Sequence, residues 1–263
     1  MKDDIVSQWE ENALAYSELI GGKGTPHHQE ILNPCVEELM GDVEGLNVLD
    51  AGCGEGYLSR HYARKGAHVT GIDVSSRLIE LSKEKTDESL SISYRTDDVC
   101  SMKTIMNAFY DKVLCNLVLL NVPCLEDALN EFNRALKPRG ELVISLVHPA
   151  FDFYGPGEWE LDKKDPDTNR RRGRYFKIDE YFKETEYSRY WKTRDGERFP
   201  EPIVFYHRTF STYFSALKQA GFVVEELREP LPITESEYFD RERRIPFFLV
   251  VKAAKTELVP EGL

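Results

Sequence analysis

A short run of glycines after the first apolar strand is the part of the sequence best suited to chemistry. Residues 48–60 read VLDAGCGEGYLSR, with Asp50 beside the strand and Gly52, Gly54 and Gly56 at every second position. Glycine has no Cβ, so the backbone can turn tightly there and approach a bound molecule. The helix that follows also points unpaired backbone N–H groups at the same place. We therefore predict a small-molecule site at the end of this strand.

The details of the glycine run favour a cationic ligand over a dinucleotide. The dinucleotide fingerprint has Gly or Ala three residues after its second glycine, whereas Tyr57 occupies that position after Gly54. Asp50 lies two residues before the first glycine. A carboxylate there would repel a pyrophosphate and attract an ammonium or sulfonium group. A nicotinamide-dependent oxidoreductase is therefore the less favoured alternative.

Composition limits the partners and the compartment that we expect. The formal net charge of −12 argues against nucleic acid, which requires a basic face. No apolar run reaches the length of a membrane span, and the first residues are acidic, so we expect neither membrane association nor a secretory signal. The cysteines are odd in number and lack C-x-x-C spacing, which favours reduced thiols in a cytoplasmic protein without a metal site. They are Cys35, Cys53, Cys100, Cys115 and Cys124.

The elements that must position the glycine run alternate between strands and helices. After helices at about 7–20 and 28–40, the alternation starts from residue 46 with the strand that carries Val48 and Leu49. Further strands are expected at 67–73, 91–95, the beginning of the run 112–120, and 141–147, with helices at 57–65, 75–85 and 125–136 between them. A helix capped by Thr209 and strands at 222–229 and 246–253 complete the pattern. This alternation predicts an α/β fold with a Rossmann-like, mostly parallel sheet of seven strands, the last two an antiparallel addition, and helices on both faces.

Residues 148–206 interrupt the alternation and are unusually aromatic. Fourteen of the 56 residues from 151 to 206 are aromatic, about a quarter, against 11% for the chain. Such a segment packs on something rather than staying disordered. It leaves the sheet at the carboxyl end of the fifth strand, where ligands bind in such sheets. We predict an inserted cap at 148–206 over a core formed by 1–147 and 207–263, with a hydrophobic cover for the sheet edge as the alternative.

The glycine run resembles that of the class I S-adenosylmethionine-dependent methyltransferases that act on small molecules. Their motif is roughly V-L-D-x-G-C-G-x-G, which residues 48–56 match throughout. GID (71–73), DKVLCNLVLLNV (111–122) and LKPRGELVIS (136–145) resemble later motifs of the family, which usually has Gly where this chain has Arg139. The resemblance covers about residues 1–147 and 207–254. It implies S-adenosyl-L-methionine as cofactor and methyl transfer as the reaction.

The resemblance also implies roles for single residues. Gly52, Cys53 and Gly54 would contact the methionine part of the cofactor through their backbone. Asp73 would accept both ribose hydroxyls, and Asp98 would accept the adenine amino group, with Asp97 as the alternative. Val74 and Val99 would lie on the faces of adenine, and Asn116 and Leu117 at the methionine end. Asp50 is also expected to bind the cofactor, as is Tyr16 from an N-terminal helix that folds over it.

A general base is needed only if the methyl acceptor must lose a proton, as a hydroxyl usually must. Alignment alone can supply about 7–11 kcal/mol of the barrier in such an in-line displacement. His148, directly after the fifth strand, and His207, where the insertion rejoins the core, are the predicted catalytic residues, each with a structural role as the alternative. His27 and His28 are further candidates that could reach the site from the N-terminal cover.

The expected acceptor is a small, largely apolar or aromatic metabolite, because the inserted segment offers hydrophobic and stacking surface. The basic run NRRRGR (169–174) has an alternative role as a handle for an anionic acceptor. An RNA methyltransferase would need the basic face that this acidic chain lacks. A cofactor-binding protein without transfer activity is the rival from a different class, since fold does not establish chemistry.

Overall fold

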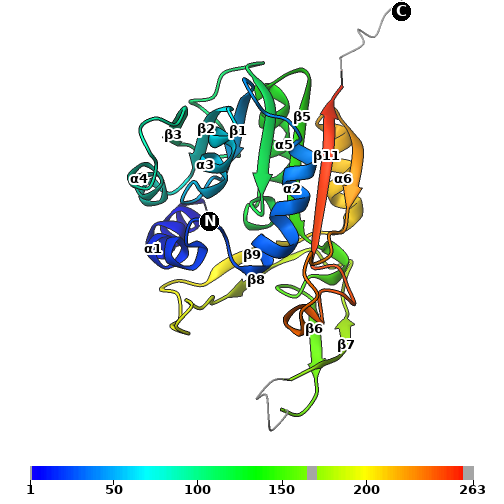
Figure 1. Cartoon of the computed structure of the whole chain (residues 1–263). Coiled ribbons are helices and arrows are strands. Elements are labelled where there is room, and N and C mark those ends of the chain that lie inside the picture. Colours follow the sequence, from blue (N-terminus) through cyan, green and yellow to red (C-terminus); the bar gives the residue numbers. More distant parts are fainter. Residues whose placement is uncertain (1, 165–170, 257–263) are drawn as a thin grey trace, which may run out of the picture.

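The central feature of the molecule is one sheet of seven strands, seen in the computed structural model that describes residues 2–164 and 171–256 (Figure 1). Its strand order is β10-β11-β5-β4-β1-β2-β3. The strands are β1 (Asn47–Ala51), β2 (His68–Asp73), β3 (Ile92–Thr96), β4 (Tyr110–Asn116), β5 (Leu136–Val147), β10 (Phe222–Arg228) and β11 (Phe248–Lys255). The first five pair in parallel, and β11 pairs antiparallel with both β5 and β10. The predicted Rossmann-like α/β fold is confirmed.

Helices cover both faces of this sheet because its buried strands carry apolar side chains on both sides. In β1, Val48 packs in one hydrophobic cluster and Leu49 in another. Helices α5 (Leu125–Ala135) and α6 (Phe210–Gln219) contribute to the cluster of Leu49, and α2 (Asn33–Met40) and α3 (Tyr57–Arg64) to that of Val48. Successive side chains of one strand therefore pack into two separate hydrophobic clusters, one on each face of the sheet.

The predicted caps of two helices are confirmed. The Ser75 hydroxyl accepts the Leu78 N–H at 3.1 Å and begins α4 (Ser76–Glu84), and the Thr209 hydroxyl accepts the Thr212 N–H at 3.2 Å and begins α6. These bonds satisfy donors that a helix start leaves unpaired. The shorter helices are η2 (Leu119–Asn121), η3 (Pro149–Phe151) and η4 (Glu237–Phe239).

Two local details differ from the sequence prediction. Strand β5 already begins at Leu136, so residues 137–140 belong to the strand and not to a separate turn. Arg139 has φ +61° there, the region that favours glycine, which explains why a glycine suits this position. The helix expected at 28–40 begins with a wide π turn, η1 (His28–Leu32). Pro34 has no N–H to offer the Glu30 carbonyl four residues earlier, and that carbonyl instead accepts the Ile233 N–H at 2.9 Å.

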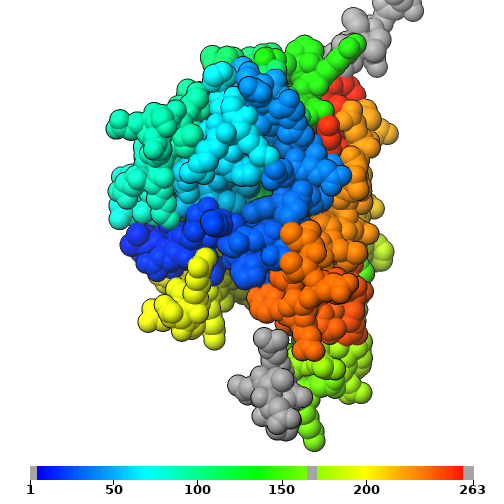
Figure 2. Space-filling view, viewed as in Figure 1, coloured from blue at the N-terminus to red at the C-terminus, as the bar shows by residue number. Residues whose placement is uncertain are grey.

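The inserted segment forms two hairpins outside the central sheet. Strands β6 (Gly157–Leu161) and β7 (Gly173–Ile178) form one, and β8 (Thr185–Arg189) and β9 (Ile203–His207) form the other. The second hairpin is bound to α1 (Lys2–Ile20), since the Asn12 side chain exchanges two hydrogen bonds of 3.0 Å with the backbone of Glu201. Figure 2 shows the blue N-terminal segment against both the yellow part of the insertion and the orange segment near residue 235.

Among residues 2–164 and 171–256, no helix combines the length and the apolar character that a membrane crossing requires.

Candidate functional site

Two adjoining cavities lie at the carboxyl ends of the central strands. The first, the glycine-loop cavity, has a volume of about 300 Å³; the second, the aromatic cavity, has about 660 Å³. Both cavities are lined by Trp9, Tyr16, Asn116, Leu117 and Asn121. These five residues, called the junction below, show that the two cavities lie next to each other at this place.

The glycine loop forms one wall of the first cavity by turning through left-handed backbone conformations. Gly52, Gly54 and Gly56 have φ values of +78°, +55° and +80°. A Cβ on Gly52 would lie 2.3 Å from a methyl carbon of Val118, and one on Gly54 would lie 3.0 Å from the Tyr16 ring. These positions therefore require glycine for conformation and for space.

Asp73 joins this loop to the start of α4 while facing the cavity. Its Oδ2 accepts the Gly54 N–H at 2.9 Å and its Oδ1 accepts the Ser75 N–H at 3.0 Å. Burial raises the pKa of Asp73 to about 6, against the lowering effect of those two hydrogen bonds. Each carboxylate oxygen keeps a further acceptor position. Asp73 is therefore placed to accept a pair of hydroxyl groups, as the sequence predicts for the ribose.

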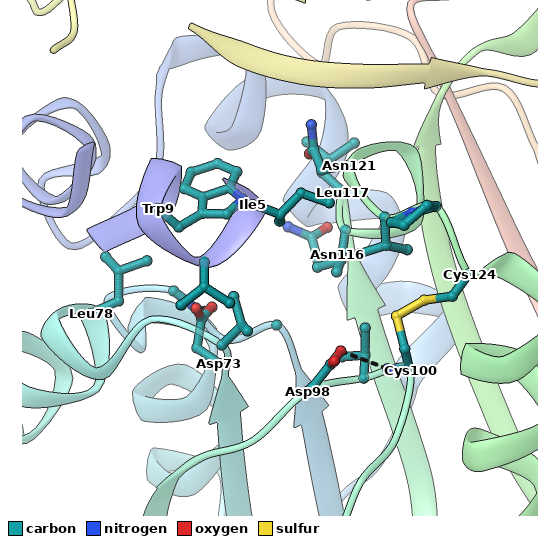
Figure 3. A pocket seen from close by; sticks show the side chains of 18 of the residues that line it. Ile5, Trp9, Asp73, Leu78, Asp98, Cys100, Asn116, Leu117, Asn121 and Cys124 are labelled. Carbon is teal, nitrogen blue, oxygen red and sulfur yellow. Dashed lines mark hydrogen bonds between the residues drawn. A yellow bond between two sulfur atoms is a disulfide. The ribbon is translucent and has the colours of Figure 1, made fainter. Parts of the chain in front are cut away.

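Of the two neighbouring aspartates considered for adenine, the structure brings Asp98 to the cavity. Asp97 is used within its own loop, where its carboxylate accepts the N–H groups of Asp98, Lys103 and Thr104. Asp98 lines the cavity and accepts the Cys100 N–H at 2.9 Å (Figure 3). Val74 and Val99 line the same cavity. They provide the apolar surface that a planar base would need.

Two residues predicted to bind the cofactor do not line the glycine-loop cavity. Asp50 is buried and accepts the Ser59 hydroxyl at 2.6 Å, and burial raises its pKa to about 6. Cys53 is also buried, with its N–H donated to the Ile72 carbonyl at 2.8 Å. Asp50 belongs to β1 and Cys53 to the loop itself, and the side chains of both are buried. The other cofactor residues expected, namely Tyr16, Gly52, Gly54, Asp73, Val74, Asp98, Val99, Asn116 and Leu117, all line the cavity.

Asn116 and Leu117 lie at the junction because Ser145 of β5 hydrogen-bonds to both of them at the end of β4. The Ser145 hydroxyl donates to Asn116 Oδ1 at 2.7 Å and accepts the Leu117 N–H at 3.0 Å. Leu117 has φ +56°, a conformation that costs a non-glycine residue about 1–3 kcal/mol. Strain of this kind persists when the surroundings fix it. The Ser145 bonds supply that fixation at the point where the two cavities meet.

The aromatic cavity is lined by residues from 9–28, 116–121, Val147, the insertion and 238–248. The insertion contributes Phe153, Tyr154, Trp159, Tyr190, Trp191, Lys192 and Phe205. Tyr154 stacks on Phe205 with ring centroids 4.2 Å apart and an interplanar angle of 8°. The part of the basic run that precedes residue 171 lies outside the described residues, and no described residue of 171–174 lines this cavity.

The two predicted catalytic histidines have structural partners and do not line either cavity. His148 Nε2 lies 2.8 Å from Glu229 Oε1, and burial lowers the pKa of His148 against that hydrogen bond. His207 lies 3.1 Å from Asp152 Oδ2 and donates from Nε2 to a backbone carbonyl; these bonds outweigh burial and raise its pKa. Catalysis by His148 or His207 stays a prediction to which this geometry lends no support. His27 and His28, by contrast, line the aromatic cavity.

The expectation that all cysteines are reduced is wrong for two of them. Cys100 and Cys124 form a disulfide with a Cα–Cα distance of 5.8 Å, and both line the glycine-loop cavity (Figure 3). Cys35, Cys53 and Cys115 are free. The pairing follows from topology, because the loop after β3 and the start of α5 meet at the same sheet edge. Twenty-four residues separate the two cysteines in sequence, so local spacing gave no indication.

Other lining residues were missed because they lie far from the glycine run in sequence. Ile5, Val6 and Trp9 of α1 cover the glycine-loop cavity, and Asn121 reaches the junction while donating to the Val204 carbonyl at 2.7 Å. Tyr238, Arg241, Glu242, Phe247 and Phe248 line the aromatic cavity. The WxxxAxxY pattern of α1 was the available signal for Trp9, and no comparable signal marked the 238–248 segment.

A family model and two solved structures that are similar to this chain are all described as methyltransferases. A family model described as a methyltransferase domain matches residues 49–144. The crystal structure of an S-adenosylmethionine dependent methyltransferase from Mesorhizobium loti is 26% identical, covers 89% of this chain and 100% of that chain, and has a TM-score of 0.69. A structure from Listeria monocytogenes, assigned to the same class, is 28% identical over 85% of this chain and 96% of its own, with a TM-score of 0.72.

A curated relative is similar over a shorter region. The ubiquinone biosynthesis O-methyltransferase of Coxiella burnetii is 33% identical over 138 residues, which is 51% of this chain and 57% of that enzyme. The match therefore spans just over half the length of each protein.

Proposed function

The chain belongs to the class I S-adenosylmethionine-dependent methyltransferases, and we propose that it methylates a small, largely apolar or aromatic metabolite. The observation that carries the proposal is the junction of the two cavities at Trp9, Tyr16, Asn116, Leu117 and Asn121. A cofactor in the glycine-loop cavity and an acceptor in the aromatic cavity would meet at these residues. Such an arrangement suits the in-line geometry of methyl transfer.

The residues of the glycine-loop cavity fit the cofactor's chemistry. Asp73 offers carboxylate oxygens to ribose hydroxyls, Asp98 offers one to an amino group, and Val74 and Val99 offer apolar surface to a base. S-adenosylmethionine supplies a methyl group on a sulfonium, which leaves as a neutral thioether. The Tyr16 ring, next to Gly54, gives the positive charge an aromatic neighbour.

The aromatic cavity supports the choice of acceptor. Six aromatic residues of the insertion line it, and its volume of about 660 Å³ is in the range of small-molecule sites. The name of the Coxiella relative is that of an O-methyltransferase of ubiquinone biosynthesis, which supports a small-molecule acceptor here as well. We therefore propose residues 148–206 as the acceptor region. The net charge of −12 weighs against RNA as acceptor.

Calorimetry tests the cofactor half of the proposal. S-adenosylmethionine should bind, and NAD, which an oxidoreductase of similar fold would use, should not. Binding of NAD without binding of S-adenosylmethionine would contradict the assignment.

A variant in the insertion tests the acceptor half. Tyr154→Ala removes the ring stacked on Phe205 and should reduce methyl transfer while leaving cofactor affinity unchanged. Phe182→Ala is the matched control, because that insertion ring is 88% exposed and lines neither cavity. Equal transfer rates in both variants would move the acceptor site away from the aromatic cavity. Binding of tRNA to the wild-type protein with a steep salt dependence would favour RNA over a small metabolite as the acceptor.

A further inference from the structure

Two adjacent histidines line the aromatic cavity, and their hydrogen bonds fix the role of each ring. His27 Nε2 lies 2.7 Å from Glu242 Oε1, and the Glu242 side chain is only 3% exposed. A carboxylate accepts, so Nε2 carries the hydrogen, and Nδ1 of the neutral ring is an acceptor. The His27 side chain keeps 29% of its surface accessible, and no described group bonds Nδ1. His27 therefore presents a proton acceptor.

His28 has the opposite arrangement. Its Nδ1 accepts the Thr25 backbone N–H at 3.3 Å and lies 2.7 Å from the Thr25 hydroxyl. A backbone N–H can only donate, so the hydrogen of the neutral ring is on Nε2. Burial, together with neighbouring His27, lowers the pKa of His28 to about 4, which keeps the ring neutral near pH 7. His28 therefore presents a proton donor.

Both histidines are held in place by segments distant in sequence. The His27 ring stacks on Phe247 with centroids 6.0 Å apart and an interplanar angle of 6°. His28 meets the edge of Tyr57, whose hydroxyl lies 3.4 Å from Asn116 Nδ2. Asn116 belongs to the cavity junction, so His28 is connected through Tyr57 to the place where methyl transfer would occur.

We propose that His27, positioned by Glu242, is the general base of the reaction, that His28 donates a hydrogen bond to a second oxygen of the acceptor, and that the acceptor is a planar aromatic molecule carrying a hydroxyl beside another oxygen. The two residues are consecutive in the chain and both line the cavity, so one ring can accept from the hydroxyl while the other donates to the second oxygen. The aromatic walls match the ring. The inference rests on the proposed methyltransferase function and adds the atom that is methylated.

The chemical step balances without a further reactant. The hydroxyl proton moves to His27 Nδ1, a new O–C bond forms to the methyl carbon, and the C–S bond of the sulfonium breaks with its electron pair left on sulfur. The products are a methyl ether, a neutral thioether and an imidazolium. Glu242 compensates the imidazolium charge, since its Oε1 already holds Nε2 and its buried Oε2 has no partner among the described residues.

Two phenols that differ in acidity test the role of His27. Catechol is neutral at mildly alkaline pH and needs a base, whereas 4-nitrocatechol is largely ionised and does not. His27→Gln should lower kcat with catechol by about 10²–10⁴-fold, should lower it far less with 4-nitrocatechol, and should leave the affinity for S-adenosylmethionine unchanged. Glu242→Gln is the second variant. It keeps the side-chain volume and should lower kcat with catechol while changing KM little.

His61→Gln is the matched control, because His61 also pairs with a carboxylate, Glu37 at 3.3 Å, but lines neither cavity. It should leave both rates unchanged. An equal loss with both phenols in His27→Gln would show a structural role and overturn the inference, as would no loss with either. If the wild-type protein binds S-adenosylmethionine but methylates neither phenol, the acceptor class is wrong while the proposed function stands. If it does not bind that cofactor, the proposed function itself fails.

Discussion

The Asp73 carboxylate accepts the backbone N–H of Gly54 at 2.9 Å, so the end of β2 holds the glycine loop that follows β1. The same carboxylate lines the glycine-loop cavity and is buried. One side chain thus shapes the loop and lines the cavity. Removing it should affect the binding of the cofactor more than the stability of the fold.

Asp73→Ala should weaken S-adenosylmethionine binding. A hydrogen bond to a charged group contributes about 1.5–3 kcal/mol, which corresponds to about 10- to 150-fold in the dissociation constant. Asp87→Ala is the matched control, because Asp87 accepts the N–H of Ser89 two residues later just as Asp73 accepts that of Ser75, yet it lies outside both cavities. Calorimetry should separate the two variants. If Asp73→Ala binds S-adenosylmethionine with wild-type affinity, Asp73 does not contact the cofactor.

Cofactor affinity should fall as the pH drops below about 6. Burial raises the pKa of both Asp73 and Asp50 to about 6, so in the free protein these carboxyls gain protons below that pH. If the ligand binds the ionised form of Asp73, affinity is complete above about pH 6 and declines below it by up to tenfold per pH unit and per proton. Calorimetry from pH 7.5 to 5 measures this, and Asp73→Asn should flatten the profile. A flat wild-type profile would contradict the coupling.

Gly52→Ala should abolish most cofactor binding, whereas Gly22→Ala should not. Both glycines have φ +78°, so each substitution carries similar backbone strain of about 1 kcal/mol. Only at Gly52 would the new Cβ lie 2.3 Å from Val118; at Gly22 nothing lies within 4 Å. Thermal melting measures the shared strain, and calorimetry measures the effect on the cavity. Equal losses of affinity would show that strain alone is responsible.

Breaking the Cys100–Cys124 disulfide should destabilise the protein and loosen the cavity wall that carries Asp98. Disulfides typically contribute about 2–4 kcal/mol to the free energy of unfolding. The double variant Cys100→Ser/Cys124→Ser should lose about that much in denaturant unfolding without reductant, while Cys35→Ser, at a free cysteine, should lose little. If dithiothreitol leaves the stability of the wild-type protein unchanged, the bond does not contribute in solution.

The sheet and the glycine-loop cavity were predictable because their signals are local. The glycine spacing, the caps at Ser75 and Thr209, and aspartates that end a strand or follow it are each readable within a few residues. The sequence alone could not decide whether Asp97 or Asp98 faces the cavity as the candidate partner of the adenine amino group. The choice depends on the direction of each side chain within the 97–104 loop, where Asp97 is bound by its own neighbours.

For the aromatic cavity, the sequence indicated only the high aromatic content of residues 148–206, not which residues line the cavity. Its two histidines lie at and just before the start of η1, and His27 meets Glu242 of the 238–248 segment, 215 residues away in sequence. Position in the chain favoured His148 and His207, since both border the insertion. The structure gives each of them a carboxylate partner away from the cavities. Tertiary contact, rather than proximity in sequence, decides which histidines reach the site.

A crystal structure with S-adenosylhomocysteine bound tests the assignment of the two cavities most directly. We expect adenine between Val74 and Val99, the ribose hydroxyls on Asp73, and the sulfur next to Asn116 and Leu117, pointing into the aromatic cavity. A sulfur turned away from that cavity, with the adenine at the junction instead, would contradict the claim that the two cavities hold the donor and the acceptor of one methyl group.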